Sequence, residues 1–304
     1  MPFRDKKSKP FALRPKDRQR AEPIFPNQEN GRSLVAQGND HKIRGRVSYV
    51  TYERKDAVVT ITLNRPERLN ALGAPVREEM ASAWRRFDQD KDARVAILTG
   101  KGRAFSVGRD LKEMAETGEV AESPTELQDL FIPNPLDFSR TPELKKPVIA
   151  AINGLTVGSG VHLALSADLR IAAESATFSL PEIKWNIYAR SSFLISQMIP
   201  TCLVSELLFL GETITAQRAY EIGLINRVVP NGDLMDAAAK MAQKIAEYSP
   251  YVIGLMKETI KKATQMNETA RIMQAWYHER VDISRDALTG AKKFSKRKGA
   301  GGRE

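Results

Sequence analysis

The sequence of 304 residues predicts an α/β fold with a helical C-terminal part. Short, largely apolar segments at Val95–Gly100 and Val148–Ile152 are typical of parallel strands that are covered on both faces. Ahead of them, residues 74–90 place apolar side chains at helical spacing, which indicates an amphipathic helix. From Ser192 onward the periodicity is mostly helical. Strands that alternate with helices, followed by helices alone, predict an α/β core with a helical trailing region.

The folded part is expected to begin at about Val47, after a basic extension over residues 1–46. Residues 50–63 alternate apolar and polar positions around Lys55 and Asp56, which predicts a β-hairpin. The second strand ends before Pro66, because proline cannot donate a hydrogen bond to a sheet.

The core is expected over residues 47–230 and the helical region over 231–304. Further strands are predicted at 168–172 and 176–179, and helices at 161–167, 192–199, 203–210, 215–222, 233–248 and 250–287. Residues 115–144, which contain four prolines, predict an irregular insert or lid.

The net charge of +10 lies in the two ends of the chain. Residues 1–46 hold 12 Lys and Arg against 5 Asp and Glu, and residues 291–304 hold 6 against 1. The middle of the chain is therefore close to neutral, so a nucleic-acid-binding face is not expected there. The N-terminal extension is rich in proline, polar and charged residues and is expected to be disordered, with RNA or an acidic partner as the alternative.

The composition also disfavours several other classes of protein. Cys202 is the only cysteine, so neither an internal disulfide nor a multi-cysteine metal site is expected, and its apolar neighbours predict a core position. No apolar run approaches the roughly 20 residues of a membrane span. The first residues lack the apolar stretch of a signal peptide. We therefore expect a cytoplasmic protein that does not associate with membranes.

The segment from Lys146 to Gly160 is the most informative part of the sequence. It predicts a buried strand that passes through a glycine turn into a helix beginning at about Val161. The first N–H groups of a helix have no partner within it and, with the helix macrodipole behind them, suit an oxyanion. Gly158 and Gly160 let the main chain come close to such a group. A plain strand-to-helix turn would give the same pattern.

Five segments in the right order decide between these readings. They are Ile61 to Leu72, Gly102 to Met114, Lys146 to Gly160, Ala176 to Glu182 and Gly223 to Val229. Together they closely resemble the crotonase (enoyl-CoA hydratase/isomerase) superfamily. The resemblance covers about residues 47–298 and leaves the first 46 residues outside.

The resemblance implies a spiral of β-β-α turns that assembles as a trimer or a pair of trimers and binds an acyl-CoA thioester. The helical C-terminal region would serve this trimerisation. The chemistry that the family shares is stabilisation of a thioester oxyanion by two main-chain N–H groups, which by position belong to Arg109 and Ser159. No metal or separate cofactor is implied, because coenzyme A enters as part of the substrate.

Two proton-transferring side chains are implied as well. Hydratases of the family carry one glutamate in the Pro-Glu motif, which is Glu182 here, and another at the position of His162. Histidine can both accept and donate protons near neutral pH. His162 could therefore pair with Glu182, activate a water, bind a polar substituent or simply be a packed helix residue, while Glu182 could instead cap a turn.

The loop after Glu182 departs from the family pattern, because it lacks the expected glycines and carries Trp185, Tyr188 and Arg190. These side chains are expected to shape the acyl pocket, and Arg190 could grip a substrate carboxylate or be a surface charge. The tail from Lys292 to Lys298 resembles the family segment that approaches the nucleotide. By position, the contacts with coenzyme A fall to Arg68, Ala71, Val107, Arg109, Asp110 and Leu111.

The function expected from the sequence is reversible hydration or dehydration of an enoyl-CoA. Isomerisation of an enoyl-CoA and hydrolysis of a C–C or thioester bond are the alternatives within the superfamily. A member without catalytic activity that binds acyl-CoA or RNA is the alternative from another class.

Overall fold

The computed structural model describes residues 48–117, 144–264 and 292. The chain divides into two units, 1–46 and 47–304, and all described residues belong to the second. The expected N-terminal extension, most of the expected insert and the helix predicted beyond residue 264 therefore lie outside the described residues. So does the C-terminal tail, except for Lys292.

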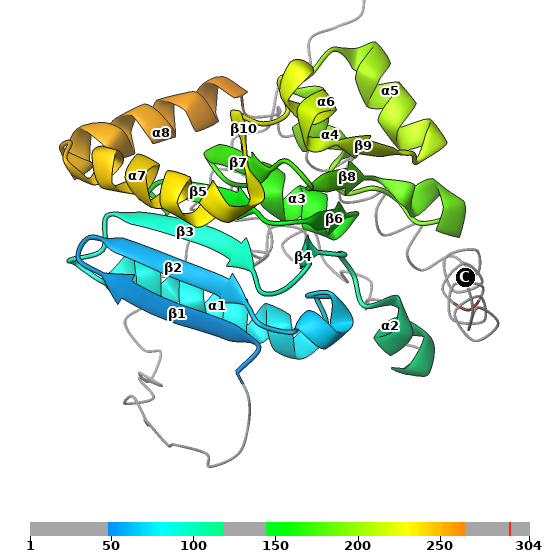
Figure 1. Ribbon diagram of the computed structural model, residues 1–304, viewed down its shortest axis with the longest axis horizontal. Coiled ribbons are helices and arrows are strands. Elements are labelled where there is room, and N and C mark those ends of the chain that lie inside the picture. The colour runs from blue at the N-terminus through cyan, green and yellow to red at the C-terminus, as the bar shows by residue number, and fades with distance from the viewer. Residues whose placement is uncertain (1–47, 118–143, 265–291, 293–304) are drawn as a thin grey trace, which may run out of the picture. The chain divides into compact units, whose positions relative to one another are not determined.

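Two sheets form the framework (Figure 1). The larger sheet has six strands in the order β1 (Val50–Lys55), β2 (Val58–Leu63), β3 (Val95–Gly100), β5 (Val148–Ile152), β7 (Leu169–Ala173) and β10 (Arg227–Val229). Its strands are parallel except for the β1–β2 hairpin. The smaller sheet has the order β4 (Ala104–Ser106), β6 (Leu155–Val157), β8 (Thr177–Ser179) and β9 (Thr213–Thr215), and β9 is antiparallel to β8.

Helices connect and cover these strands. The α-helices are α1 (Ala74–Gln89), α2 (Leu111–Thr117), α3 (Ser159–Leu165), α4 (Ser192–Ser196), α5 (Thr201–Leu210), α6 (Ala216–Glu221), α7 (Leu234–Ala246) and α8 (Pro250–Thr264). The 3-10 helices are η2 (Pro66–Arg68), η4 (Pro181–Trp185) and η5 (Asn231–Asp233).

The connectivity is a spiral of repeated turns. Each turn places a long strand in the larger sheet, a short strand in the smaller sheet and then a helix, as in β3-β4-α2, β5-β6-α3 and β7-β8-η4. This arrangement confirms the expected β-β-α spiral. Because β4, β6 and β8 are parallel neighbours, the segments that follow them leave the smaller sheet at the same edge.

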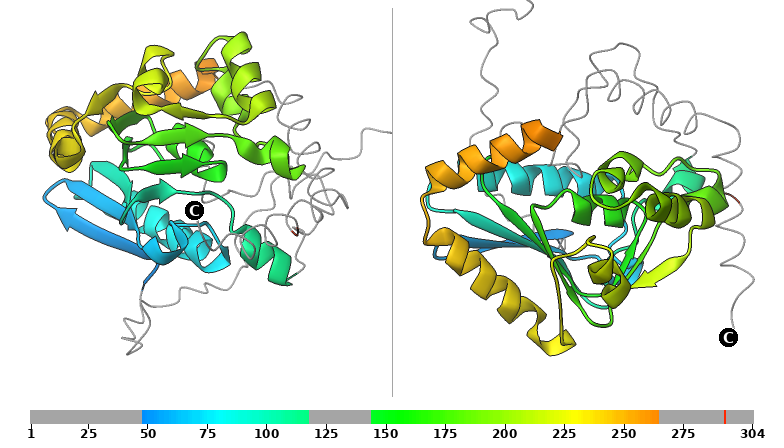
Figure 2. Two further views of the ribbon diagram at one scale, coloured as in Figure 1. Left: turned by 45° about the vertical axis from the view of Figure 1, so that its right-hand side comes forward. Right: turned by 90° about the horizontal axis from the view of Figure 1, so that it is seen from above.

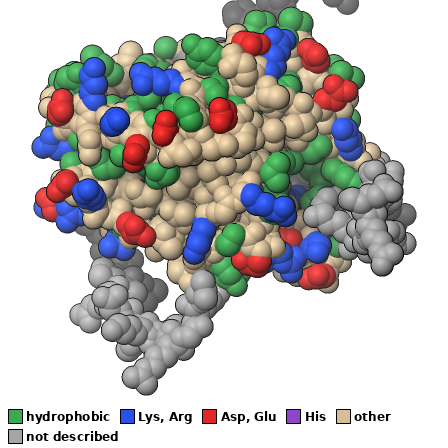
Figure 3. Space-filling model, viewed as in Figure 1, with side chains coloured by type: hydrophobic (Ala, Val, Ile, Leu, Met, Phe, Trp, Pro, Cys, Tyr) green, Lys and Arg blue, Asp and Glu red, His purple; other side chains and the backbone are tan. Residues whose placement is uncertain are grey.

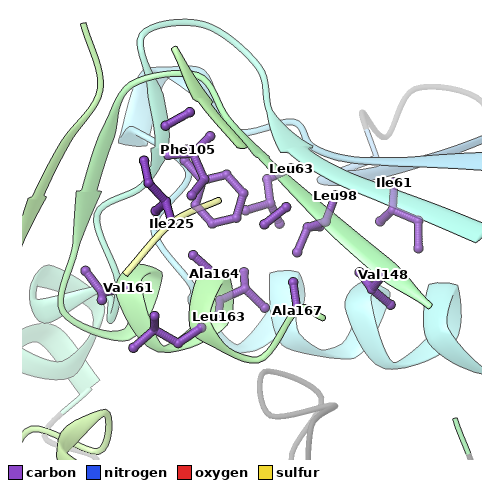
Figure 4. Close-up of a cluster of buried hydrophobic side chains, with 14 of the residues drawn as sticks. Ile61, Leu63, Leu98, Phe105, Val148, Val161, Leu163, Ala164, Ala167 and Ile225 are labelled. Carbon is purple, nitrogen blue, oxygen red and sulfur yellow. The ribbon is translucent and has the colours of Figure 1, made fainter. Parts of the chain in front are cut away.

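The larger sheet is covered on both faces, which confirms the interpretation of its apolar strands. In β3, Val95 and Ile97 pack with α7, whereas Ala96 and Leu98 belong to the core that includes α1. Figure 2 shows α1 and α7 on opposite faces of this sheet. Figure 4 shows part of the larger core, where side chains of β2 and β3 meet those of α3.

Most predicted elements are present, with shifts at their ends. The apolar side chains at helical spacing in α1 are all buried, namely Val76, Met80, Ala83, Trp84 and Phe87. The glycine turn differs, because β6 lies within it and the helix begins at Ser159 instead of Val161. The expected insert is partly wrong, since α2 continues to Thr117. Cys202 was expected in the core but is exposed, because α5 turns Val204 and Leu207 inward instead.

Helix α8 is held to the larger sheet by a buried cation. The Nζ atom of Lys257 donates to Oδ2 of Asp168 at 2.6 Å and to the main-chain oxygen of Lys146 at 2.8 Å. Desolvation lowers the pKa of this lysine, so the ion pair and hydrogen bonds are what keep the charge there. We expect Lys257→Ala to lower the free energy of unfolding in urea by about 3 kcal/mol, since Asp168 loses its charged partner and keeps the N–H of Val148.

Lys262 provides the comparison for this prediction. It pairs with Glu258 on the exposed side of the same helix at 2.6 Å. Such surface pairs contribute little to stability. Equal stability losses in Lys257→Ala and Lys262→Ala would contradict the role given to Lys257.

Candidate active site

The loop after β4 aims the N–H group of Arg109. Gly108, which precedes it, has a φ of 77° and is held at both of its main-chain polar groups. Its N–H donates to Oγ of Ser106 at 3.1 Å, and its oxygen accepts the N–H of Leu72 at 2.8 Å. In a trans peptide the C=O and N–H groups point in opposite directions. The N–H of Arg109 therefore points away from Leu72.

The loop after β6 aims the N–H group of Ser159 in the same manner. Gly158 has a φ of 57°, and its N–H donates to the main-chain oxygen of Ser179 at 2.9 Å. Its oxygen accepts the N–H of His162 at 3.1 Å, so the N–H of Ser159 points out of the helix. Because α3 has only 7 residues, we expect the N–H group of Ser159 to stabilise a bound anion more than the helix dipole does.

The two loops are in direct contact. A Cβ atom placed on Gly108 would lie 2.6 Å from the main-chain oxygen of Val157 and 2.8 Å from the nitrogen of Ser159. Only glycine fits at position 108, because its φ also lies in the left-handed region. Arg109 and Ser159 line the same cavity, as the sequence predicts for a pair of oxyanion donors.

Glu182 places a carboxyl group beside these amides. It follows Pro181 in η4, and a Cβ atom on Gly158 would lie 3.2 Å from its Oε1. The residue is partly exposed, whereas Oε2 is sealed from solvent and has no hydrogen-bond partner in the described ranges. This burial raises the pKa of Glu182 to about 7. The carboxyl group can therefore both take up and release a proton near neutral pH.

A cavity of about 410 Å³ connects the predicted site residues. The predicted residues that line it are Arg68, Ala71, Val107, Arg109, Asp110, Leu111, Ser159, Glu182, Trp185, Tyr188 and Arg190. Sequence reasoning did not single out Glu67, Leu69, Leu72, Arg77, Lys112, Val157 and Ile187, which line it as well. Among the charged residues that line it in the described part of the chain, Arg and Lys outnumber Asp and Glu by five to three.

His162 differs from the other candidates. It lies in α3 and is 3% exposed, but it is not among the residues that line the cavity. Its main-chain oxygen accepts the N–H of Ser166 at 3.0 Å and the hydroxyl of Ser166 at 2.9 Å. The structure therefore places His162 in the first turn of α3, close in sequence to Ser159, with its side chain buried in the protein.

Asp110 stabilises the first donor loop with its side chain. The carboxylate is 5% exposed and accepts from Nη1 of Arg65 at 3.0 Å. Its other oxygen accepts the N–H of Glu113 at 3.2 Å and so caps the start of α2. The residue that follows Arg109 is thus fixed by an ion pair with Arg65.

The loop after η4 forms another part of the cavity wall. Trp185, the last residue of η4, and Ile187 and Tyr188 in the loop are partly buried, and Arg190 is exposed. The hydroxyl of Tyr188 accepts a hydrogen bond from Ser192 at 3.0 Å, which ties the loop to α4. This part of the cavity wall is therefore aromatic and basic.

Two further properties concern residues 48–117, 144–264 and 292. Within these ranges, no group of three or more His, Cys, Asp or Glu residues could hold a metal ion. None of the helices described there has the length and apolar character needed to cross a bilayer. On the face seen in Figure 3, acidic and basic side chains are interspersed.

Comparison with known proteins places the chain among enzymes of one family. The model of the enoyl-CoA hydratase/isomerase family matches residues 53–298. A carnitinyl-CoA dehydratase from Proteus mirabilis is 36% identical over 258 residues, which cover 80% of this chain and 94% of that protein.

Solved structures agree with this placement. A carnitinyl-CoA hydratase from Mycobacterium avium has a TM-score of 0.73 and 30% identity, covering 83% of this chain and 97% of that one. An enoyl-CoA hydratase from Mycobacterium tuberculosis has a TM-score of 0.64 and 33% identity, with the same coverage. With its spiral fold and its two glycine-held amides, the chain belongs to the enoyl-CoA hydratase/isomerase family of the crotonase superfamily.

Proposed function

We propose that the protein catalyses the reversible addition of water to the double bond of an enoyl-CoA thioester. The observation that carries this proposal is the position of the Glu182 carboxyl group over Gly158, beside the loop amides of Arg109 and Ser159. The relatives named as carnitinyl-CoA dehydratase and enoyl-CoA hydratase support it. Coenzyme A takes part as the carrier of the acyl group.

In this mechanism the thioester oxygen accepts hydrogen bonds from the N–H groups of Arg109 and Ser159. Proton transfer at Cα gives the thioester enolate character, so negative charge develops on that oxygen. A preorganised donor at such a position lowers the barrier by about 3–4 kcal/mol. No side chain is needed for this step, so the identity of residues 109 and 159 can vary.

Glu182 moves the proton at Cα. In hydration the protonated carboxyl group donates its proton to Cα, the oxygen of water bonds to Cβ, and the proton that this water loses passes to His162. In dehydration the carboxylate takes the Cα proton, and the Cβ hydroxyl leaves as water with the proton that His162 returns. A group with a pKa of about 7 is suited to both directions.

His162 is proposed as the partner of Glu182 on the water side of the reaction. It replaces the second glutamate of family hydratases and lies in the helix that begins with Ser159. Because His162 does not line the cavity, we expect its loss to reduce activity less than the loss of Glu182. The same observation favours a second function, isomerisation by Glu182 alone, which moves a proton between Cα and Cγ.

The charge of Arg190 affects which acyl groups the cavity favours. The carnitinyl group of the relatives' substrate name carries a fixed trimethylammonium charge, which a nearby guanidinium would repel. Arg190 lies in the loop after η4 and lines the cavity with Tyr188 of this loop and Trp185 of η4. We propose an acyl chain without a fixed positive charge, and we expect a terminal carboxylate to improve binding.

A substrate panel tests the proposed function. The purified protein is incubated with crotonyl-CoA, carnitinyl-CoA, a 3-enoyl-CoA and an acyl-CoA with a 1,3-diketone. We expect crotonyl-CoA to lose its conjugated absorbance and gain one water by mass spectrometry, and carnitinyl-CoA to react more slowly. His162→Ala should retain part of this activity.

Other outcomes of the panel identify the rival functions. Conversion of the 3-enoyl-CoA without uptake of water would assign isomerisation, and cleavage of the diketone would assign hydrolysis. If no thioester reacts and RNA binding is lost on deletion of residues 1–46, the enzyme proposal fails. Assembly as a homotrimer or a pair of trimers stays a prediction, which sedimentation of the full chain measures.

A further inference from the structure

Ser106 lies beneath both amide-bearing loops, at the end of β4. Its side chain is fully buried. Its hydroxyl donates to the main-chain oxygen of Asn70 at 2.8 Å and accepts the N–H of Gly108 at 3.1 Å. A serine hydroxyl has one proton to donate, so these two bonds fix the orientation of the group as well as its position.

The two glycines that aim the donors are held by different kinds of group. The N–H of Gly158 bonds to the main-chain oxygen of Ser179, which any residue at that position would supply. The N–H of Gly108 bonds to the side chain of Ser106. For the hydrogen bond to the glycine N–H, only the loop that carries Arg109 therefore depends on a particular side chain.

Ser106 also touches the second donor loop. A Cβ atom on Gly160 would overlap the main-chain oxygen of Ser106 and lie 3.1 Å from its Cβ. Across the smaller sheet, Ser106 pairs with Thr156 in β6, the strand that leads into the loop of Ser159. A substitution at Ser106 would therefore alter the packing of both loops that carry the amide donors.

We propose that Ser106 is a positioning residue that sets the distance and angle between the two amide donors. This inference rests on the proposed function, since the donors matter only when a thioester oxygen lies between them. When the bond from Ser106 is lost, the peptide that carries the N–H of Arg109 is held only by Leu72, whose N–H donates to the oxygen of Gly108 at 2.8 Å, and it can tilt about the flexible dihedrals of Gly108. Asn70 supports Ser106 in turn, because its buried amide donates to the main-chain oxygen of Ala104 at 2.8 Å.

The test measures how strongly the site polarises a thioester carbonyl. Butyryl-CoA, labelled with carbon-13 at the carbonyl, is bound to the full-length protein and its infrared band recorded; being saturated, it cannot add water. In wild type we expect the band to move to lower frequency on binding. In Ser106→Ala we expect roughly half of this shift, and about a tenfold lower kcat for crotonyl-CoA with little change in KM.

Thr99→Val is the matched control. It removes another buried hydroxyl, which donates to the main-chain oxygen of Ala151 at 2.8 Å within the larger sheet. We expect it to reduce thermal stability as Ser106→Ala does, but to keep the full infrared shift. Should Ser106→Ala fail to fold, Ser106→Cys retains a weak donor and acceptor and carries the same test with a smaller loss.

The outcomes separate this inference from the proposed function. A full shift and an unchanged kcat in Ser106→Ala or Ser106→Cys would overturn the positioning role while leaving the oxyanion donors in place. A wild-type protein that binds butyryl-CoA without any shift would overturn the proposed function and the inference together.

Discussion

Glu182→Gln is expected to lower kcat for the hydration of crotonyl-CoA by about a thousandfold, because the amide cannot donate or accept the Cα proton. The change keeps the size of the side chain and removes only its proton chemistry. Binding of butyryl-CoA should be largely retained, since the amides of Arg109 and Ser159 are untouched. Stopped-flow or steady-state loss of the enoyl-thioester absorbance measures the effect.

The pH dependence of kcat/KM in the wild-type protein tests the role of Glu182 in proton transfer. Burial raises the pKa of Glu182 to about 7. Hydration needs the protonated form, so kcat/KM for hydration should fall as the pH rises through about 7. Hydration and dehydration interconvert without net uptake of a proton, so the ratio of their kcat/KM values does not depend on pH. We therefore expect kcat/KM for the 3-hydroxyacyl-CoA to fall over the same interval. Glu182→Gln should lose both slopes.

Glu67→Gln is the matched control for this change. Glu67 also lines the cavity, but it is exposed and lies 3.9 Å from the guanidinium of Arg65. We expect kcat to change little and the pH profile to keep its shape. An equal loss in both variants would mean that cavity charge, and not proton transfer by Glu182, controls the rate.

The parts of the fold that could be predicted are those with long, regular signals. All six residues of β3 are buried, because both faces of the sheet are covered, so an unbroken apolar run marks the strand. Helix α1 repeats five buried side chains at helical spacing. The cavity-lining candidates could be named because they stand in motifs of the family, although their catalytic roles stay predictions.

Short elements and tertiary contacts could not be predicted. Strands β4, β6, β9 and β10 have three residues each, too few to show a period of two. The role of the Ser106 hydroxyl depends on tertiary contacts, because its partners Asn70 and Gly108 belong to separate sequence motifs that only the fold brings together. Lys146 is a similar case: its ammonium caps the end of α1 at the main-chain oxygen of Asp90, 2.6 Å away.

Ser159→Pro tests the main-chain donor directly, because proline lacks the N–H group and little else of the backbone changes. Ser159 is the first residue of α3, a position where proline is well tolerated. Gly158 precedes it with φ 57° and ψ −120°, the mirror image of the extended conformation that suits a residue before proline, and glycine holds it without change. We expect kcat for crotonyl-CoA to fall by roughly 10²–10³-fold, the effect of removing one oxyanion donor.

Ser159→Ala separates the amide from the side chain, since it removes the hydroxyl and keeps the N–H group. It should lose far less activity than Ser159→Pro, while circular dichroism and thermal unfolding report whether the proline variant retains the fold. The infrared band of bound butyryl-CoA should shift less in Ser159→Pro than in Ser159→Ala, because one polarising donor is missing. A proline variant that folds and keeps both its kcat and its band shift would show that the oxyanion does not bind at Ser159.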